Sequence, residues 1–235
     1  MTNQEKNLPK KETFAGTLIQ TRGSSKRREL TLEIEFARHP VTKQKSDRKG
    51  KSSPEKANEA RRRIQVTNVI IHGLVIHHIR PHTPGAVMGP GKKMGTMDRI
   101  DGDAIRLVTS SKVWIDHNTL FECEDGLIDV TRGSTGITIS NNWFRNHKKV
   151  MLLGHHDGFL RNKDMKVTVV FNHFGPNCKQ RMPRVRHGYA HVVDNLYQGW
   201  GLYAIGGSVN PSVKSEANLF IAPNSRNKED MDCFQ

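Results

Sequence analysis

The chain has 235 residues, with 37 Lys/Arg against 23 Asp/Glu and a formal net charge of +14. Its hydrophobic fraction of 35% and mean hydropathy of −0.63 are polar for a compact globule, but they suit a solenoid with much exposed surface. No apolar run could cross a membrane or act as an export signal, so the sequence predicts a soluble chain with no membrane contact.

Residues 1–65 differ in composition from the rest of the chain. They hold 17 Lys/Arg against 8 Asp/Glu, so most of the positive charge lies there. Large apolar residues are scarce in 38–63, which predicts a basic, poorly ordered tail before one folded domain at 66–235. Nucleic-acid binding is the alternative that such charge raises. Aromatic residues make up only 6% and do not alternate with the basic runs, which argues against it.

From residue 66 onward, short β-branched runs recur between turns, and five share the pattern Asn, any residue, large apolar residue. The five copies begin at Asn118, Asn142, Asn172, Asn195 and Asn218, at offsets of 24, 30, 23 and 23. An earlier copy, Gly73-Leu74-Val75, lies 45 positions before the first, with 80–100 inserted between them. This period predicts a parallel β-helix whose asparagines stack in a ladder. The alternative is an all-β globule with chance asparagine spacing.

Acidic residues gather at the ends of two neighbouring runs. Asp101 and Asp103 precede one strand, and Asp125 and Asp129 occur one coil later. Residues four apart on a strand point to one side, so coil stacking would bring these carboxylates together. Such a cluster needs a cation, and carboxylates without Cys or His partners suit calcium. Each Asp-Gly pair could instead be an ordinary turn.

Basic residues gather at the ends of two further runs. Lys149 lies in the segment His147-Lys148-Lys149, ahead of one strand. The second group is Arg181-Met182-Pro183-Arg184-Val185-Arg186, in which Arg184 and Arg186 share a face and Arg181 lies apart, beyond the proline. Beside a calcium site, these groups indicate a groove for a polyanion. A solvated basic face is the alternative.

The remaining metal-binding residue types form no recognisable motif. Cys123, Cys178 and Cys233 lie far apart and match no zinc spacing. The pairs His77-His78 and His155-His156 resemble metal sites, but scattered strand histidines are more often structural. The sequence therefore assigns no zinc site.

At the level of motifs, the chain resembles the plant branch of the pectate lyase family. The segments DGDAI, VWIDHNTL, DGLIDVTRGSTGITISNN, KKVMLLGHHD, FNHFGPNCKQRMPRVRHGYAHVVDNLY, YAIGGS and FIAP carry the resemblance, over 66 to about 223. It implies a right-handed, single-stranded parallel β-helix and a secreted, monomeric, calcium-dependent lyase of the plant cell wall. Relative to the family, the chain looks truncated at its N-terminus and shows no signal peptide.

The resemblance also implies a calcium site. The family's metal ligands fall on Asp101, Asp103, Asp125 and Asp129. The related pectin lyases act on methylated substrate without calcium and lose these carboxylates. Their presence here implies an unesterified substrate, the (1,4)-α-D-galacturonan of pectate.

The family's substrate and catalytic positions are implied in the same way. Arg181 takes the place of the base that removes the C5 proton, and Lys149, Arg184 and Arg186 take substrate-binding places. Neighbouring positive charges should favour a neutral Arg181, giving an alkaline optimum and products with 4,5-unsaturated ends. A calcium-dependent protein that binds polygalacturonate without cleaving it is the alternative.

The segment Trp114-Ile115-Asp116-His117 also matches the family. Asp116 and His117 could be catalytic. We expect instead that they form a buried, hydrogen-bonded pair within a turn.

Overall fold

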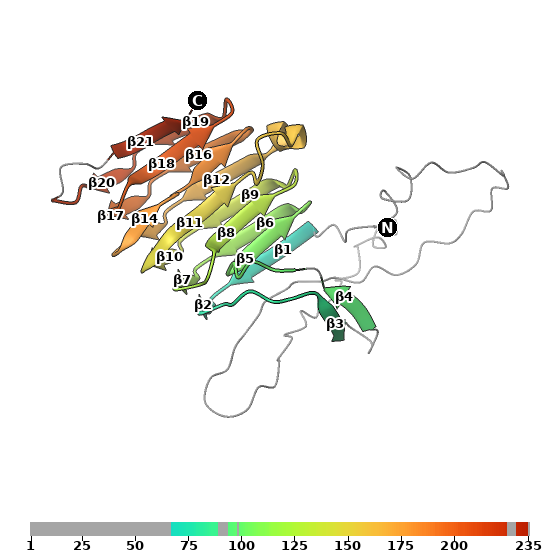
Figure 1. Cartoon of the computed structure of the whole chain (residues 1–235). Helices are drawn as coiled ribbons and strands as arrows, with labels where there is room; N and C mark the ends of the chain where they lie inside the picture. The colour runs from blue at the N-terminus through green and yellow to red at the C-terminus, as the bar shows by residue number, and fades with distance from the viewer. Residues whose placement is uncertain (1–66, 89–93, 98, 225–228, 235) are drawn as a thin grey trace, which may run out of the picture.

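The computed structural model describes residues 67–88, 94–97, 99–224 and 229–234. Short strands follow one another around a stack of coils, and three sheets run along it (Figure 1). Neighbouring strands within these sheets pair in parallel. The predicted parallel β-helix is therefore confirmed, whereas the predicted tail at 1–65 lies outside the described residues.

Each coil contributes one strand to each of the three sheets. The first sheet contains β1 (Thr67–His72), β6 (Ser111–Asp116), β9 (Thr135–Ser140), β12 (Lys166–Val170), β16 (Tyr189–Val193) and β19 (Ser212–Glu216). The second contains β2 (Val75–His77), β7 (Thr119–Phe121), β10 (Trp143–Arg145), β13 (His173–Phe174), β17 (Leu196–Gln198) and β20 (Leu219–Ile221). The third contains β5 (Ile105–Val108), β8 (Gly126–Thr131), β11 (His147–Leu153), β15 (Arg184–Arg186), β18 (Tyr203–Ser208) and β21 (Glu229–Phe234), with β14 (Cys178–Gln180) beside β11.

Two insertions interrupt the regular coils. The segment 80–100 contains an antiparallel hairpin of β3 (Gly85–Met88) and β4 (Met94–Met97). The 3₁₀ helix η2 (Leu160–Asp164) lies in the one coil with an offset of 30. Within the described ranges, no helix is both long and apolar enough to cross a membrane.

The repeated asparagines form the predicted ladder at the bend between the first and second sheets. The amide nitrogen of Asn118 donates to Oδ1 of Asn142, at 2.9 Å, and the same contact recurs to Asn172, Asn195 and Asn218. Each side-chain nitrogen also reaches a backbone carbonyl, as from Asn172 to Ile139. These bonds satisfy backbone groups that a sharp bend would otherwise leave unpaired inside the protein.

A left-handed residue precedes every asparagine of the ladder. Positive φ occurs at His117, Asn141, Phe171, Asp194 and Ala217. In the first coil, the equivalent left-handed position is Gly73, and Leu74 donates its amide to Oδ1 of Asn118. The early copy of the repeat is therefore Leu74-Val75-Ile76, 44 positions before Asn118, and the predicted offset of 45 is wrong by one residue.

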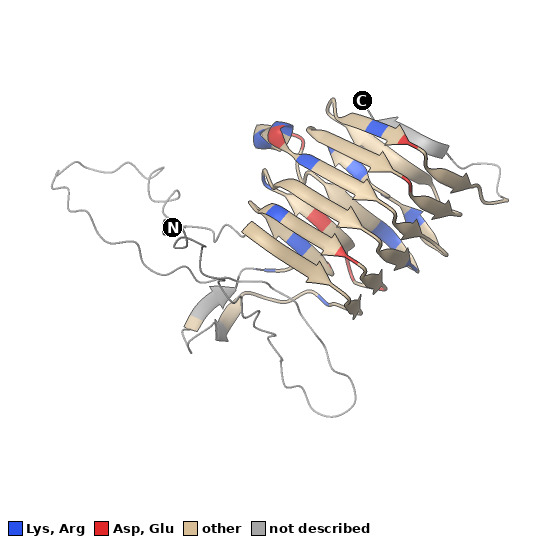
Figure 2. Cartoon of the chain, turned by 180° about the vertical axis from the view of Figure 1, so that it is seen from behind, with Lys and Arg blue, Asp and Glu red and all other residues tan. Residues whose placement is uncertain are grey.

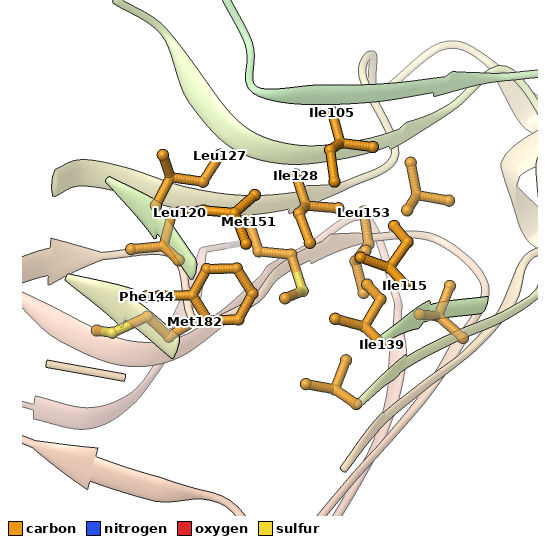
Figure 3. Packing of buried hydrophobic residues seen from close by; sticks show 14 of the residues in the cluster. Ile105, Ile115, Leu120, Leu127, Ile128, Ile139, Phe144, Met151, Leu153 and Met182 are labelled. Carbon is orange, nitrogen blue, oxygen red and sulfur yellow. The ribbon is translucent and has the colours of Figure 1, made fainter. Parts of the chain in front are cut away.

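The apolar residue of each repeat points into the core. Phe144, Phe174 and Tyr197 are fully buried, and their rings stack at centroid distances of 5.0 and 4.9 Å. Figure 3 shows Leu120 and Phe144 of the second sheet meeting Leu127 and Met151 of the third. Stacking gives each coil the apolar contacts that it could not make alone.

We expect Asn172→Ala to lower the free energy of unfolding by about 3 kcal/mol. The change removes a buried amide and leaves the amide of Asn142 and the carbonyl of Ile139 without partners. Urea denaturation measures the effect. The matched control, Gln198→Ala, removes an exposed amide and should change stability by less than about 0.5 kcal/mol. If Asn172→Ala lowered the free energy of unfolding as little as Gln198→Ala does, the ladder would contribute nothing measurable to stability.

Candidate active site

The predicted site residues come from successive coils of the third sheet and the turns that lead into it. Asp125 immediately precedes β8, Asp129 lies within β8, and Lys149 lies in β11. Arg181 follows β14, and β15 begins at Arg184. In β8, Asp129 is only partly buried while its neighbours Ile128 and Val130 point into the core. Asp129 is the one residue of β8 that is not buried, which places its side chain on the outer face.

Two carboxylates converge above Gly126. The amide of Gly126 donates to Oδ1 of Asp103, at 2.7 Å. A Cβ added at Gly126 would lie 2.7 Å from Oδ1 of Asp129 and 2.9 Å from Oδ1 of Asp103. The missing side chain therefore leaves a space into which both oxygens point.

This convergence is electrostatically unfavourable without a cation. Burial raises the pKa of Asp129 well above its ordinary value, and the charges of Asp103 and Asp125 raise it further. Burial also raises the pKa of Asp103, although the bond from Gly126 opposes this effect. A cation would relieve the repulsion between these partly desolvated carboxylates. Because their ligand atoms are hard oxygens, calcium is the cation that fits.

The other two predicted ligands have partners of their own. Oδ1 of Asp125 lies 2.5 Å from Nζ of Lys149, and Asp101 forms an ion pair with Arg106 at 3.6 Å. The structure therefore brings Asp103 and Asp129 together, with Asp125 close enough to raise the pKa of both. Asp101 is exposed and turned toward Arg106.

The predicted arginines lie at and just before β15, on the coil after that of Lys149. Arg184 and Arg186 share the outer face of β15, with Val185 buried between them. The charges of Arg106 and Arg181 lower the pKa of Asp129, against the larger effects of burial and the neighbouring carboxylates. Nε of Arg181 is buried and has no hydrogen-bond partner among the described residues.

Arg186 is held at the edge of this cluster. Its Nε lies 2.9 Å from Oδ1 of Asp157, and its Nη1 donates to the carbonyl of Gly154 at 3.1 Å. Burial and the charges of Arg184 and Arg181 lower the pKa of Arg186, and Asp157 opposes them. A small hollow beside Arg186, of about 150 Å³, is lined by the His155–Asp157 turn.

Three residues of the site were missed from the sequence. Arg106 lies in register with Asp129 across β5 and β8, 23 positions earlier, so the coil period could have identified it. Asp157 orients Arg186, and His147 places Nε2 2.6 Å from the carbonyl oxygen of Asp125. The contact of Asp157 follows no repeat, so the sequence carried no signal for it. The contact of His147 spans 22 positions, close to one coil, so the coil period could have indicated it.

Comparison with protein families and curated sequences shows which family the chain resembles. The pectate lyase family model matches residues 49–232. "Probable pectate lyase 16" of Arabidopsis thaliana is 55% identical over 166 residues, 71% of this chain and 42% of the relative. "Pectate lyase 1" of Juniperus virginiana is 54% identical over 169 residues, 71% of this chain and 46% of the relative. The chain thus spans less than half the length of these relatives.

Solved structures show the same architecture. The cedar pollen allergen jun a 1 is 51% identical, with a TM-score of 0.69 over 71% of this chain and 49% of that one. A pectate lyase bound to a hexasaccharide is 23% identical, with a TM-score of 0.60 over 73% of this chain and 48% of that one. The second likeness concerns the fold alone. From the family match and the close plant relatives, the chain belongs to the pectate lyase family.

Proposed function

We propose that this protein is a calcium-dependent pectate lyase that cleaves (1,4)-α-D-galacturonan by β-elimination, leaving 4,5-unsaturated ends. The observation that carries the proposal is the convergence of Asp103 and Asp129 over Gly126. The family membership supports it. We further propose that the protein acts as a monomer on pectate in the plant cell wall.

Asp103, Asp125 and Asp129 are the residues that would hold calcium, with Asp101 at the margin. When bound, calcium would neutralise the carboxylates and withdraw charge from the C6 carboxylate of a galacturonate, which acidifies the C5 proton. Asp125 is paired with Lys149 in this structure. Metal binding would therefore compete with that ion pair and leave the ammonium of Lys149 available to substrate.

The basic residues account for substrate binding. Lys149, Arg184 and Arg186 lie on neighbouring strands of the third sheet, and such strands are about 4.8 Å apart. They can therefore contact consecutive carboxylates or the developing oxyanion along one polysaccharide chain. A planar guanidinium suits a carboxylate because it can donate two parallel hydrogen bonds.

Arg181 is the proposed base. It would accept the C5 proton, and the electron pair of the C5–H bond would form the double bond between C4 and C5. The leaving oxygen would depart with the electron pair of its bond to C4 and take a proton from water. Nε of Arg181 makes no hydrogen bond within the described residues, and the charge of the side chain acts on Asp129. A guanidinium normally stays protonated, so we expect turnover to rise with pH.

Mass spectrometry of the products tests the proposal. With calcium and unesterified polygalacturonate, we expect fragments that are lighter by one water than hydrolysis products, and none from fully methylated pectin. Calcium-dependent retention on polygalacturonate without fragments would favour the binding-only alternative. On the described coils, Figure 2 shows acidic segments among the basic ones rather than a face that is basic throughout, so this part of the chain gives no specific support to nucleic-acid binding.

We expect Gly126→Ala to weaken calcium binding by at least about tenfold without changing any charge. The new methyl group would occupy the space where Oδ1 of Asp129 and Oδ1 of Asp103 converge. Isothermal titration calorimetry measures the affinity. Gly85→Ala is the matched control, because its Cβ would lie no closer than 3.5 Å to the nearest neighbouring atom. Unchanged calcium affinity in Gly126→Ala would remove this pair of carboxylates from the site.

A further inference from the structure

A second cluster of metal-ligating groups lies away from the third sheet, at the bend between the first and second sheets. His72 ends β1, Asp116 ends β6, and His117 follows directly at the left-handed bend. His72 and Asp116 are 44 positions apart but are register partners on adjacent strands. The coil stacking alone therefore brings these residues together, at the β1 edge of the sheet (Figure 1).

Three donor atoms in this cluster point toward one another. Nδ1 of His72 lies 3.0 Å from Oδ2 of Asp116, and Nδ1 of His117 lies 2.6 Å from the same oxygen. All three ligand atoms lie within 4.8 Å of one another. Zinc holds nitrogen and oxygen ligands at about 2.0–2.2 Å, so its ligands lie about 3.3 Å apart in a tetrahedron. Small shifts of two exposed imidazoles would create that geometry.

The carboxylate at the centre is already oriented by its neighbours. Oδ1 of Asp116 accepts hydrogen bonds from Oγ of Ser140, at 2.6 Å, and from Nδ2 of Asn141, at 2.9 Å. The side chain of Asp116 is only 5% exposed, whereas the imidazoles of His72 and His117 are 58% and 59% exposed. One oxygen is thus fixed by the protein, and the other faces two accessible ring nitrogens.

We propose that His72, Asp116 and His117 form a binding site for a borderline transition-metal ion such as zinc. Two imidazoles and one carboxylate are a donor set that zinc favours over calcium, and Ser140 and Asn141 supply the hydrogen bonds that orient such a ligand. The exposure of both rings leaves a coordination position open to water. The site is separate in sheet and in chemistry from the proposed calcium site.

Zinc at this position would join the first described coil to the second. His72 belongs to the coil of β1, and the other two ligands belong to the coil of β6. Because the ion bridges two coils only in the folded protein, zinc binding should raise the melting temperature. Among the strands, the edge strand β1 should gain the most stability from bound zinc.

Titration of calcium-saturated protein with zinc tests this site, because saturating calcium occupies the proposed acidic site. We expect one zinc ion per chain by calorimetry, and tetrahedral d–d bands when cobalt replaces zinc. His72→Gln and His117→Asn should each weaken zinc binding at least about tenfold, and Ser140→Ala should weaken it about 10- to 100-fold. Asparagine is chosen to replace His117 because this position has a left-handed backbone, which asparagine adopts readily.

His77→Gln is the matched control. His77 is an exposed histidine whose Nδ1 lies 2.6 Å from that of His78, so it could bind metal adventitiously. Its loss should leave the zinc affinity and the cobalt spectrum unchanged. Circular dichroism confirms the fold of each variant. The proposal is overturned if wild-type protein takes up no zinc, or if His72→Gln and His117→Asn bind it as tightly as wild type.

Discussion

Arg181→Lys is expected to lose turnover of polygalacturonate by roughly 10²- to 10⁴-fold, the usual contribution of a positioned base. Lysine keeps the positive charge beside Asp129 but moves the proton acceptor away from the position of the guanidinium. Substrate binding should survive, because Lys149 and Arg186 remain. The expected signature is a fall in kcat with little change in KM.

Arg186→Ala provides the contrast for that experiment. It removes a charge-assisted contact to substrate, so KM should rise and kcat/KM should fall roughly 10- to 100-fold. Arg161→Ala, an exposed arginine of η2, removes the same charge outside the site and should leave both constants unchanged. If folded Arg181→Lys keeps activity comparable with wild type, the base is another residue.

Asp129→Asn is expected to stabilise the calcium-free protein and to abolish its stabilisation by calcium. Asparagine keeps the shape of the side chain but removes a charge that burial, Asp103 and Asp125 all disfavour. In wild type, calcium at one hundred times its Kd should add about 2.7 kcal/mol to the free energy of unfolding. Thermal melts with calcium and with chelator measure both effects.

The same residue makes calcium-free stability depend on pH. The folded-state pKa values of Asp129 and Asp103 lie above the ordinary value of 3.8, so the folded protein binds more protons than the unfolded chain between these values. Their contribution to stability therefore falls as pH rises from 3.8 through the raised pKa values. Calcium affinity should rise across the same window, because binding displaces protons.

Asp194→Asn is the control for the charge change. Asp194 is an exposed residue at a left-handed bend, which asparagine adopts readily, and its replacement should leave the response to calcium intact. Melting curves of Asp129→Asn that still shift with calcium as in wild type would exclude this carboxylate as a ligand.

The fold could be predicted because its main determinants are periodic. Asn118 and Asn142 are spaced by one coil, and both their hydrogen bonds and the stacking of the apolar residues two positions on follow from that spacing. Periodicity also placed Arg184 and Arg186 on one face. The predicted register of the first coil is wrong by one residue. Gly73 does not occupy the ladder position but is the left-handed residue that precedes the ladder position.

The details of the site could not be predicted, because they depend on contacts between turns of irregular length. Asp125 forms an ion pair with Lys149 and does not join Asp103 and Asp129 above Gly126. Which of these two positions the carboxylate takes depends on local distances that the sequence does not give. The contact between Asp157 and Arg186 bridges 29 positions that include η2. The predicted hydrogen bond between Asp116 and His117 is present, but only Asp116 is buried: the imidazole of His117 is exposed, so the prediction of a buried pair is wrong for His117. The structure also adds His72 from the preceding coil.

The ultraviolet absorbance of 4,5-unsaturated uronate reports the proposed elimination itself. Wild-type protein is mixed with polygalacturonate at alkaline pH, once with calcium and once with chelator, and the absorbance is followed over time. We expect the absorbance to increase steadily with calcium, not to increase with chelator, and to increase hardly at all for Arg181→Lys with calcium. Folded wild-type protein that binds calcium and polygalacturonate but produces no increase would contradict the proposed elimination.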